Sequence, residues 1–254
     1  MMLFYDTGKY NPFMNMALDE VLLKQEKPVL RLYQWDPPGL SVGRFQLLDD
    51  IDTGFCKKNG IDIVRRLTGG KTVLHDIELT YSFIIDEDSM PESVIESYEL
   101  ISNALILGLK KINIEAHMNK SPAKRKSAIC FTDPSYNEIL VNNRKIIGSA
   151  QARLKGKILQ HGAILMEINY EKLVNCFMVR DKKETLEDTK SRVTAIKQEN
   201  DNITLNELKR SIISGFTEVF RADIINRELT QEQLREAGNL VKNKYGSRKW
   251  LYQR

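Results

Sequence analysis

Residues 61–75, Ile-Asp-Ile-Val-Arg-Arg-Leu-Thr-Gly-Gly-Lys-Thr-Val-Leu-His, place a double glycine between two apolar stretches. The β-branched residues on either side predict strands at 61–66 and 72–75. Working outward, similar runs bounded by turn residues predict the remaining strands, at 29–35, 40–45, 79–85, 136–141, 145–154 and 158–166.

Helical spacing appears on both sides of these strands. Asn11-Pro12 opens one predicted helix, and residues 93–111 form the clearest, with apolar residues on one face. A short helix is expected at 51–58 and a charged loop at 181–190. Thr204-Leu-Asn-Glu207 and Thr230-Gln-Glu-Gln233 are capping boxes, which begin two further helices.

Clustered hairpins with flanking helices predict an α/β (α+β) fold, built on a mixed, largely antiparallel sheet. A doubly wound parallel sheet would need regular alternation of strand and helix. We expect one catalytic domain over residues 1–254, with the C-terminal helices of residues 204–254 packed on it.

Composition excludes several classes of protein. The 254 residues are 42% hydrophobic, enough for a buried core, and carry a net charge of only +4, which is weak support for nucleic-acid binding. We see no apolar run of roughly 18 residues and no signal peptide, and expect a cytoplasmic protein with no membrane contact. The three cysteines and three histidines form no zinc or other ligand motif, so we predict no structural metal.

The double glycine carries the first candidate site. Gly69 and Gly70 have no Cβ, so the backbone there can approach a ligand closely, with Arg65, Arg66 and Lys71 supplying charge. A plain hairpin turn with a solvated basic rim explains the same residues, and Gly-Gly turns are common. The spacing of a phosphate-binding P-loop is absent.

Cys130 is the candidate nucleophile. The basic stretch 120–126 precedes it, with no acidic residue between Glu115 and Asp133, and nearby cations lower the pKa of a thiol. Cys56 lies in a predicted surface helix close to an aspartate, and Cys176 lies in an apolar stretch typical of the core. A buried, inert thiol is the ordinary alternative for Cys130.

Small residues mark a second candidate site in the predicted strand 145–154. Gly148, Ser149 and Ala150 weaken packing in a sheet and therefore indicate space for a ligand. Lys145 beside them can direct an ammonium at a carbonyl, although an exposed strand lysine is the common case.

Two histidines lie near these segments. His75 follows the glycine turn and His161, next to Gly162, lies within a strand. Either is a candidate for proton transfer, with a hydrogen-bonded structural role favoured for His161.

In this order the motifs resemble the catalytic domain shared by lipoate-protein ligases, octanoyltransferases and biotin-protein ligases. The matching segments are Asn15-Met-Ala-Leu-Asp-Glu20, Leu40-Ser-Val-Gly-Arg-Phe-Gln46, Arg65-Arg-Leu-Thr-Gly-Gly-Lys-Thr-Val-Leu-His-Asp76, Arg144-Lys-Ile-Ile-Gly-Ser-Ala-Gln151, Ile158-Leu-Gln-His-Gly-Ala-Ile-Leu165 and Lys244-Tyr-Gly-Ser-Arg-Lys-Trp250. The resemblance implies a mixed-sheet fold with one active-site tunnel. It makes Thr68, with its neighbours in the glycine motif, part of the substrate-binding set.

Within this family, Cys130-Phe-Thr-Asp-Pro-Ser135 resembles the segment of the cysteine-dependent octanoyltransferases. Lys71 stands where the ligases usually carry a third glycine, whereas Arg44 is also familiar from the ligase branch. The resemblance implies Cys130 as nucleophile and Lys145 as its catalytic partner.

The implied reaction moves octanoyl from acyl carrier protein to a lysine of a lipoyl domain, such as the glycine-cleavage H protein or a 2-oxoacid dehydrogenase subunit. It needs no cofactor, and we expect a monomer. Three alternatives stay open: a ligase that uses ATP and Mg, an amidotransferase between lipoyl domains, and a non-enzymatic carrier or scaffold. The basic stretch 120–126 is a candidate for steering an acidic carrier protein, or is simply a solvated loop.

Overall fold

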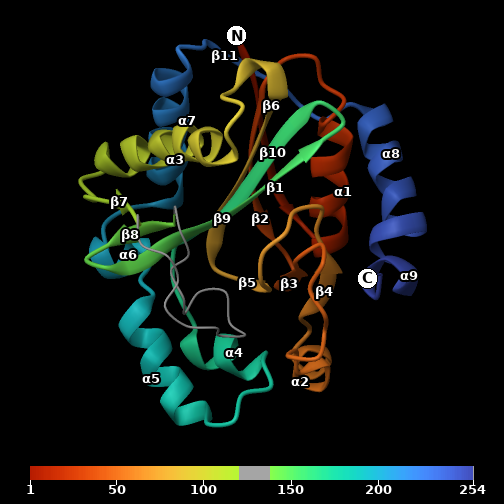
Figure 1. The fold of residues 1–254 in the computed structure, drawn as a ribbon, viewed down its shortest axis with the longest axis vertical. Helices are drawn as coiled ribbons and strands as arrows, with labels where there is room; N and C mark the ends of the chain where they lie inside the picture. Colours follow the sequence, from red (N-terminus) through yellow and green to blue (C-terminus); the bar gives the residue numbers. More distant parts are fainter. Residues whose placement is uncertain (120–137, 254) are drawn as a thin grey trace.

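The computed structural model describes residues 1–119 and 138–253 (Figure 1). In these residues a large sheet has the strand order β11-β1-β2-β6-β10-β9-β8-β7 and a small sheet the order β4-β3-β5. The strands of the two sheets are β1 (Met2–Tyr10), β2 (Val29–Trp35), β3 (Gly39–Val42), β4 (Asp62–Arg65), β5 (Val73–His75), β6 (Glu78–Asp86), β7 (His117–Met118), β8 (Ile139–Val141), β9 (Arg144–Leu154), β10 (Lys157–Leu165) and β11 (Ile224–Asn226).

The pairing within the sheets confirms the predicted fold class. Strand β1 runs parallel to β11 and β2, and β3 runs parallel to β4. All other neighbouring strands in the described residues are antiparallel, from β2 through β6, β10, β9 and β8 to β7. The sheet is therefore mixed and largely antiparallel, as the hairpin pattern predicted.

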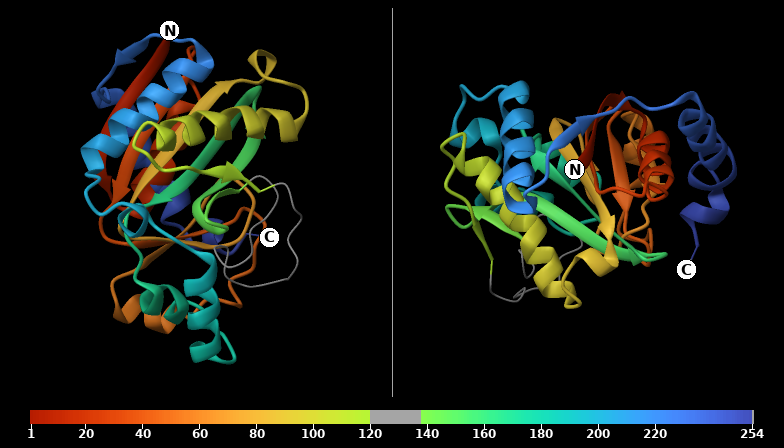
Figure 2. Two further views of the ribbon diagram at one scale, coloured as in Figure 1. Left: turned by 90° about the vertical axis from the view of Figure 1, so that its left-hand side faces the viewer. Right: turned by 90° about the horizontal axis from the view of Figure 1, so that it is seen from above.

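Helices cover both faces of the large sheet. Helices α3 and α7 lie on one face, whereas α1 and, outside it, α8 lie on the other (Figures 1 and 2). No helix in residues 1–119 or 138–253 has the length and apolar character needed to cross a bilayer. The helices are α1 (Pro12–Leu22), α2 (Thr53–Lys58), η1 (Glu87–Ser89), α3 (Val94–Lys110), α4 (Tyr170–Asn175), α5 (Lys182–Arg192), α6 (Ile196–Glu199), α7 (Leu205–Phe220), α8 (Gln231–Leu240), the π-helical turn η2 (Val241–Tyr245) and α9 (Arg248–Leu251).

Capping explains where the predicted helices begin. The Asn11 side chain accepts a hydrogen bond from the Met14 amide at 2.9 Å and starts α1. Both predicted capping boxes are confirmed: Thr204 begins α7 with Glu207, and Thr230 begins α8 in the same way.

One sequence prediction is wrong, and one of the alternatives left open is excluded. The charged stretch 181–190 is not a loop but helix α5, begun by Asp181, whose side chain accepts from two following amides. It has no apolar stripe, so periodicity did not reveal it. The double glycine is also not a hairpin turn, because β4 and β5 lie on opposite sides of β3 and do not pair with each other.

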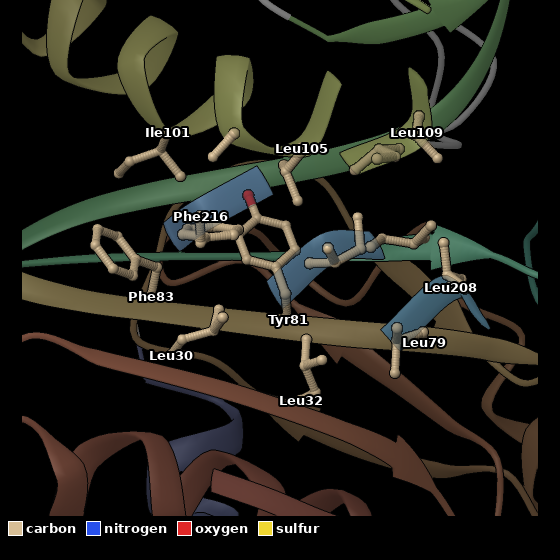
Figure 3. Packing of buried hydrophobic residues seen from close by; sticks show 14 of the residues in the cluster. Leu30, Leu32, Leu79, Tyr81, Phe83, Ile101, Leu105, Leu109, Leu208 and Phe216 are labelled. Carbon is tan, nitrogen blue, oxygen red and sulfur yellow. The ribbon is translucent and has the colours of Figure 1, made fainter. Parts of the chain in front are cut away.

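The hydrophobic core lies between the large sheet and helices α3 and α7. Figure 3 shows Tyr81 and Phe83 of β6 among side chains of these helices, and the rings of Phe83 and Phe216 lie 5.0 Å apart. Leu30 and Leu32 belong to this cluster, whereas Tyr33 and Trp35 of β2 belong to another cluster, on the side of α1. The alternation of a strand thereby sends one set of β2 side chains to the core and the other toward a cavity.

Candidate functional site

A cavity of about 250 Å³ is lined by residues of both sheets. The large sheet contributes side chains from β2, β6, β9 and β10, and the small sheet contributes residues of β3 and β5 together with the glycine turn. The lining residues are Met16, Tyr33, Trp35, Ser41, Arg66, Gly70, Lys71, Val73, His75, Thr80, Glu138, Gly148, Ser149, Ala150, His161, Gly162 and Ala163.

Two glycines bring the turn into the cavity wall. Gly70 has a φ of +87°, in the region that side chains rarely adopt. A Cβ on Gly43 would lie only 1.8 Å from the Gly70 carbonyl oxygen, so glycine at position 43 allows the two backbones to touch. The close contact with the Gly70 backbone therefore explains why position 43 is a glycine.

Arg66 holds this turn in shape. Its guanidinium donates to the carbonyl oxygens of Ser41 at 2.6 Å, Gly69 at 2.7 Å and Lys71 at 2.8 Å. The same side chain reaches the cavity wall, so its positive charge lies beside any ligand there. Arg66 is thus both a clamp on the turn and a candidate ligand contact.

Arg65 is buried and lies behind the turn. Its guanidinium donates to the carbonyl oxygens of Gly43 at 2.6 Å, Gln46 at 2.8 Å and Leu251 at 2.6 Å. The indole of Trp250 in turn donates to the Arg65 carbonyl oxygen at 2.9 Å. Arg65 therefore joins the C-terminal segment to the loop after β3 and is absent from the cavity lining.

A first hydroxyl–imidazole–carboxylate chain is centred on His161. Its Nε2 lies 2.7 Å from Thr68 Oγ1 and its Nδ1 lies 3.0 Å from Asp19 Oδ2. Arg31 donates to the other Asp19 oxygen at 2.8 Å. Burial lowers the pKa of His161, although the hydrogen bond to Asp19 acts in the opposite direction. The lowered pKa keeps the imidazole neutral.

The carboxyl group of Asp19 is charged in this arrangement. Burial alone would raise the pKa of Asp19, but the hydrogen bond to His161 and the charge of Arg31 outweigh it and lower the pKa. The hydroxyl of Tyr33 also donates to Asp19, at 3.2 Å. Three neighbours thus satisfy this buried carboxylate.

A second chain of the same kind is centred on His75. Its Nε2 lies 2.7 Å from Ser41 Oγ and its Nδ1 lies 2.7 Å from Glu78 Oε1. The indole ring of Trp35 stacks on the imidazole, with centroids 3.9 Å apart and an angle of 7°. Thr80 donates to Glu78 at 2.5 Å and accepts from the Trp35 indole at 2.7 Å. The ring is therefore held in one orientation.

Arg66 joins the two chains. Its Nε donates to Thr68 Oγ1 at 3.1 Å and its Nη1 donates to Ser41 Oγ at 3.2 Å. A continuous buried polar network thus runs from Asp19 to Glu78 along the cavity.

Lys145 and the small residues occupy strand β9. Lys145 is fully buried, and its ammonium lies 2.5 Å from Glu138 Oε1. Glu138 lines the cavity, as do Gly148, Ser149 and Ala150. A Cβ on Gly162, which pairs with Ser149 across the sheet, would lie 2.5 Å from the Ser149 hydroxyl. Glycine at position 162 therefore allows close packing between β10 and β9, and the small residues of both strands form part of the cavity wall.

The predicted nucleophile Cys130 and the basic stretch 120–126 lie outside the described residues. Cys176 is buried, as predicted for a core thiol. The predicted surface helix that carries Cys56 is present as α2, with Asp52 as its N-cap, and Cys56 is its one buried residue. The hydrogen bond with Cys56 and, after it, burial raise the pKa of Cys176, so the Cys176 thiol stays protonated. Neither cysteine is among the residues that line the cavity.

Comparison of the sequence with known proteins identifies the family of this chain. The lipoyl protein ligase A/B catalytic domain matches residues 11–217. The chain belongs to this family. It is 41% identical to the octanoyltransferase LipM of Staphylococcus epidermidis, over 99% of this chain and 98% of that protein. It is 37% identical to the octanoyltransferase LipM of Bacillus subtilis, over the same shares of the two chains.

Solved structures of the lipoyl protein ligase fold agree with this assignment. A bipartite lipoate protein ligase from Thermoplasma acidophilum has a TM-score of 0.84 and 25% identity, covering 99% of this chain and 95% of that one. Lipoate-protein ligase A bound with ATP has a TM-score of 0.83 and 25% identity, covering 98% of this chain and 97% of that one. The resemblance found in the sequence motifs is confirmed.

The cavity gathers most, but not all, of the residues that the motifs singled out. Arg66, Gly70, Lys71, His75, His161 and the small residues of β9 and β10 line it. Arg65, Thr68 and Gly69 support the wall from behind, and Lys145 reaches it through Glu138.

Sequence reasoning missed the partners that complete the polar network. Asp19, Ser41 and Glu78 were not singled out, although the first two lie inside quoted motifs. Alternation was the available signal, because Glu78, Thr80 and Ser82 are polar residues at alternate positions of β6.

Proposed function

We propose that this protein is an octanoyltransferase of protein lipoylation, which carries the acyl group as a thioester on Cys130. The observation that carries the proposal is the 41% identity to an octanoyltransferase over nearly the whole length of both chains. The small residues of β9 and β10 support it, since they leave room for an alkyl chain beside a polar wall. Burial of that chain contributes about 0.8 kcal/mol per methylene.

The reaction has two balanced steps. The Cys130 thiolate attacks the thioester carbonyl of the octanoyl donor, the C–S bond to the carrier breaks, and the carrier leaves as a thiolate that takes a proton from water. The ε-amine of the acceptor lysine then attacks the enzyme thioester, the C–S bond breaks, and an amide forms while the thiol is regenerated. Thioester exchange is nearly isoenergetic and amide formation runs downhill, so no ATP is consumed.

Lys145 is the proposed electrostatic partner of the acyl group. Its side chain is fully buried, and its Nζ lies 2.5 Å from Glu138 Oε1. A fixed ammonium in a buried site stabilises the negative charge that develops on a thioester oxygen during attack. Lys145 therefore polarises the acyl carbonyl and stabilises the thiolate in this mechanism.

The substrates follow from the same assignment. We assign octanoyl-acyl carrier protein as donor and a lipoyl-domain protein as acceptor, namely the glycine-cleavage H protein or a 2-oxoacid dehydrogenase subunit. The enzyme acts as a monomer in the cytoplasm, where the donor is made. The basic stretch 120–126 attracts the acidic carrier, and this attraction weakens as salt increases.

Mass spectrometry tests the proposal. The protein is incubated with octanoyl-acyl carrier protein in the absence of ATP, and the mass of the Cys130 peptide is measured. We expect an octanoyl adduct on that peptide, which disappears when an apo-lipoyl domain is added. A Cys130→Ser variant that still transfers octanoyl would overturn the assignment.

A second candidate is an ATP-dependent ligase, because lipoate-protein ligase A bound with ATP shares the fold at a TM-score of 0.83. In that case Lys145 and the glycine turn would hold the phosphate of an acyl-adenylate, with Mg as the accompanying ion. Such an enzyme would exchange pyrophosphate into ATP and form no adduct on Cys130. An amidotransferase would instead take octanoyl from a second lipoyl domain, and a carrier or scaffold would do none of these.

A further inference from the structure

Two buried cysteines lie against each other, away from the cavity. Cys56 is on α2 and Cys176 caps the C-terminal end of α4, and neither side chain is exposed. The Cys176 thiol donates a hydrogen bond to the Cys56 sulfur. Because neither cysteine lines the cavity, this contact is separate from the proposed transfer.

The backbone holds the segments that carry these cysteines together. The Asp52 amide donates to the Cys176 carbonyl oxygen at 2.9 Å. Ile51 and Phe177, the neighbours of these two residues in the chain, form an antiparallel bridge. The start of α2 is therefore fixed beside the end of α4.

The direction of the Cys56 side chain follows from its place on α2. Cys56 comes four residues after Asp52, so the two residues share one face of the helix. Side chains of a helix tilt toward its N-terminal end, which directs the Cys56 sulfur back toward Asp52 and its backbone partner Cys176. The two side chains therefore converge, as a disulfide requires.

The hydrogen bond makes the two sulfurs chemically different. It lowers the pKa of Cys56, against the opposing effects of burial and of the Asp52 charge. The same bond raises the pKa of Cys176, which keeps its proton. Because the thiolate is the form that attacks an oxidant, Cys56 is the member of the pair that reacts first.

We propose that Cys56 and Cys176 form a reversible disulfide upon oxidation and serve as a redox-responsive staple between α2 and α4. The oxidant is a hydroperoxide. The Cys56 thiolate attacks its O–O bond, which gives a sulfenic acid on Cys56 and a hydroxide that takes up a proton to form water. The Cys176 sulfur then attacks the Cys56 sulfur, the S–O bond breaks, and the Cys176 proton leaves with the hydroxyl group as a second water. Two electrons thus pass from the two thiols to the peroxide, and a dithiol reductant returns them.

Oxidation of buried sulfurs requires a local opening of the structure. Helix α2 has six residues, and Cys56 is the one buried residue among them. A short helix with so little buried surface opens more readily than the core. In a reducing compartment, disulfides are typically transient and redox-sensing, which suits a bond that forms only when an oxidant is present.

The staple acts on the support of the cavity wall. Both cysteines belong to one hydrophobic cluster with Leu40 and Val42 of β3 and Leu74 of β5, and the small sheet forms part of the wall. The bond would close a loop of about 120 residues, and long loops restrict the unfolded chain most. We therefore expect oxidation to raise the melting temperature by about 5 to 10 °C.

Peptide mapping tests the bond. The reduced protein is treated with hydrogen peroxide, its remaining thiols are blocked in denaturant, and the tryptic peptides are analysed by mass spectrometry. We expect peptides 45–57 and 173–180 to be joined with the loss of two hydrogen atoms, and to separate after treatment with dithiothreitol. Peptide 127–144, which carries Cys130, should stay outside this bond, and Cys130→Ser should form the bond to the same extent.

Thermal unfolding gives the second readout. Oxidised wild type and oxidised Cys130→Ser should melt about 5 to 10 °C above their reduced forms, whereas Cys176→Ala should show no rise. Peroxide treatment that leaves peptides 45–57 and 173–180 unlinked, or that links either of them to peptide 127–144, would overturn the disulfide. A fully formed bond with an unchanged melting temperature would overturn the staple. Because the wild type alone reports both results, a poorly folded variant leaves the outcome decided.

Discussion

The guanidinium of Arg65 and the carbonyl oxygen of Leu251 are joined by two hydrogen bonds, of 2.8 Å from Nε and 2.6 Å from Nη2. The two residues are 186 positions apart in the chain. Because the same guanidinium also binds the loop after β3, the C-terminal segment and the cavity wall depend on one side chain.

Replacement of Arg65 by lysine should therefore destabilise the fold. A lysine ammonium cannot reproduce the planar fork that serves several carbonyl oxygens at once. We expect the free energy of unfolding to fall by about 2 kcal/mol in urea denaturation, with octanoyl transfer reduced in parallel. Arg235→Lys, at an exposed position of α8, is the control and should change stability little. Equal stabilities of the two variants would contradict the clamp.

A Gly43→Ala variant should displace the glycine turn. The added Cβ would lie 1.8 Å from the Gly70 carbonyl oxygen, which is backbone and can move only with the turn. We expect a loss of about 1–3 kcal/mol in the free energy of unfolding. Gly54→Ala is the matched control, since its Cβ would meet only the Asp52 carboxylate, at 3.4 Å. An unchanged melting temperature for Gly43→Ala would show that the contact is not required.

Replacement of Lys145 by methionine should slow octanoyl transfer. The volume is similar, but the ammonium that polarises the acyl carbonyl is lost, so we expect a rate about 100-fold lower. Lys190→Met on α5, where the side chain is 46% exposed, should leave the rate unchanged. Transfer is measured as octanoyl incorporation into a lipoyl domain, with circular dichroism as the check on folding. A Lys145→Met rate within a few-fold of wild type would remove this residue from the mechanism.

Stability should fall on acidification below about pH 6.5, through His161. Its pKa is lower in the folded protein than in the unfolded chain, so the unfolded chain binds the proton first as pH falls. Below about pH 4 the depressed pKa of Asp19 adds a second loss in the same direction, because its carboxylate is stabilised only in the folded state.

Urea denaturation at about pH 7 and about pH 5 checks the histidine part. We expect the difference in unfolding free energy to shrink in His161→Gln and to persist in His117→Gln, whose imidazole is exposed. An undiminished difference in His161→Gln would assign the pH dependence to other groups.

Local rules accounted for most elements of the fold. The capping residues Asn11, Thr204 and Thr230 mark helix starts because a single side chain satisfies a free amide within one turn. Helical periodicity did not reveal α5, because this helix lacks an apolar stripe. The capping residue Asp181 was its only local signal. Strand β3 ends at Val42, three residues before the predicted end, because the chain turns there to meet Gly70.

The sequence by itself determined the family, the antiparallel hairpins and part of the set of polar residues that gather at the cavity. These depend on neighbours within a few positions, or on motifs whose order is readable along the chain. Only the tertiary structure decided which role each residue takes: Arg65 clamps backbone, Arg66 joins two histidine chains, and Glu78 keeps one oxygen without a partner. Hydrogen bonds between strands distant in sequence set these roles, because the direction of a side chain follows from register and sheet order.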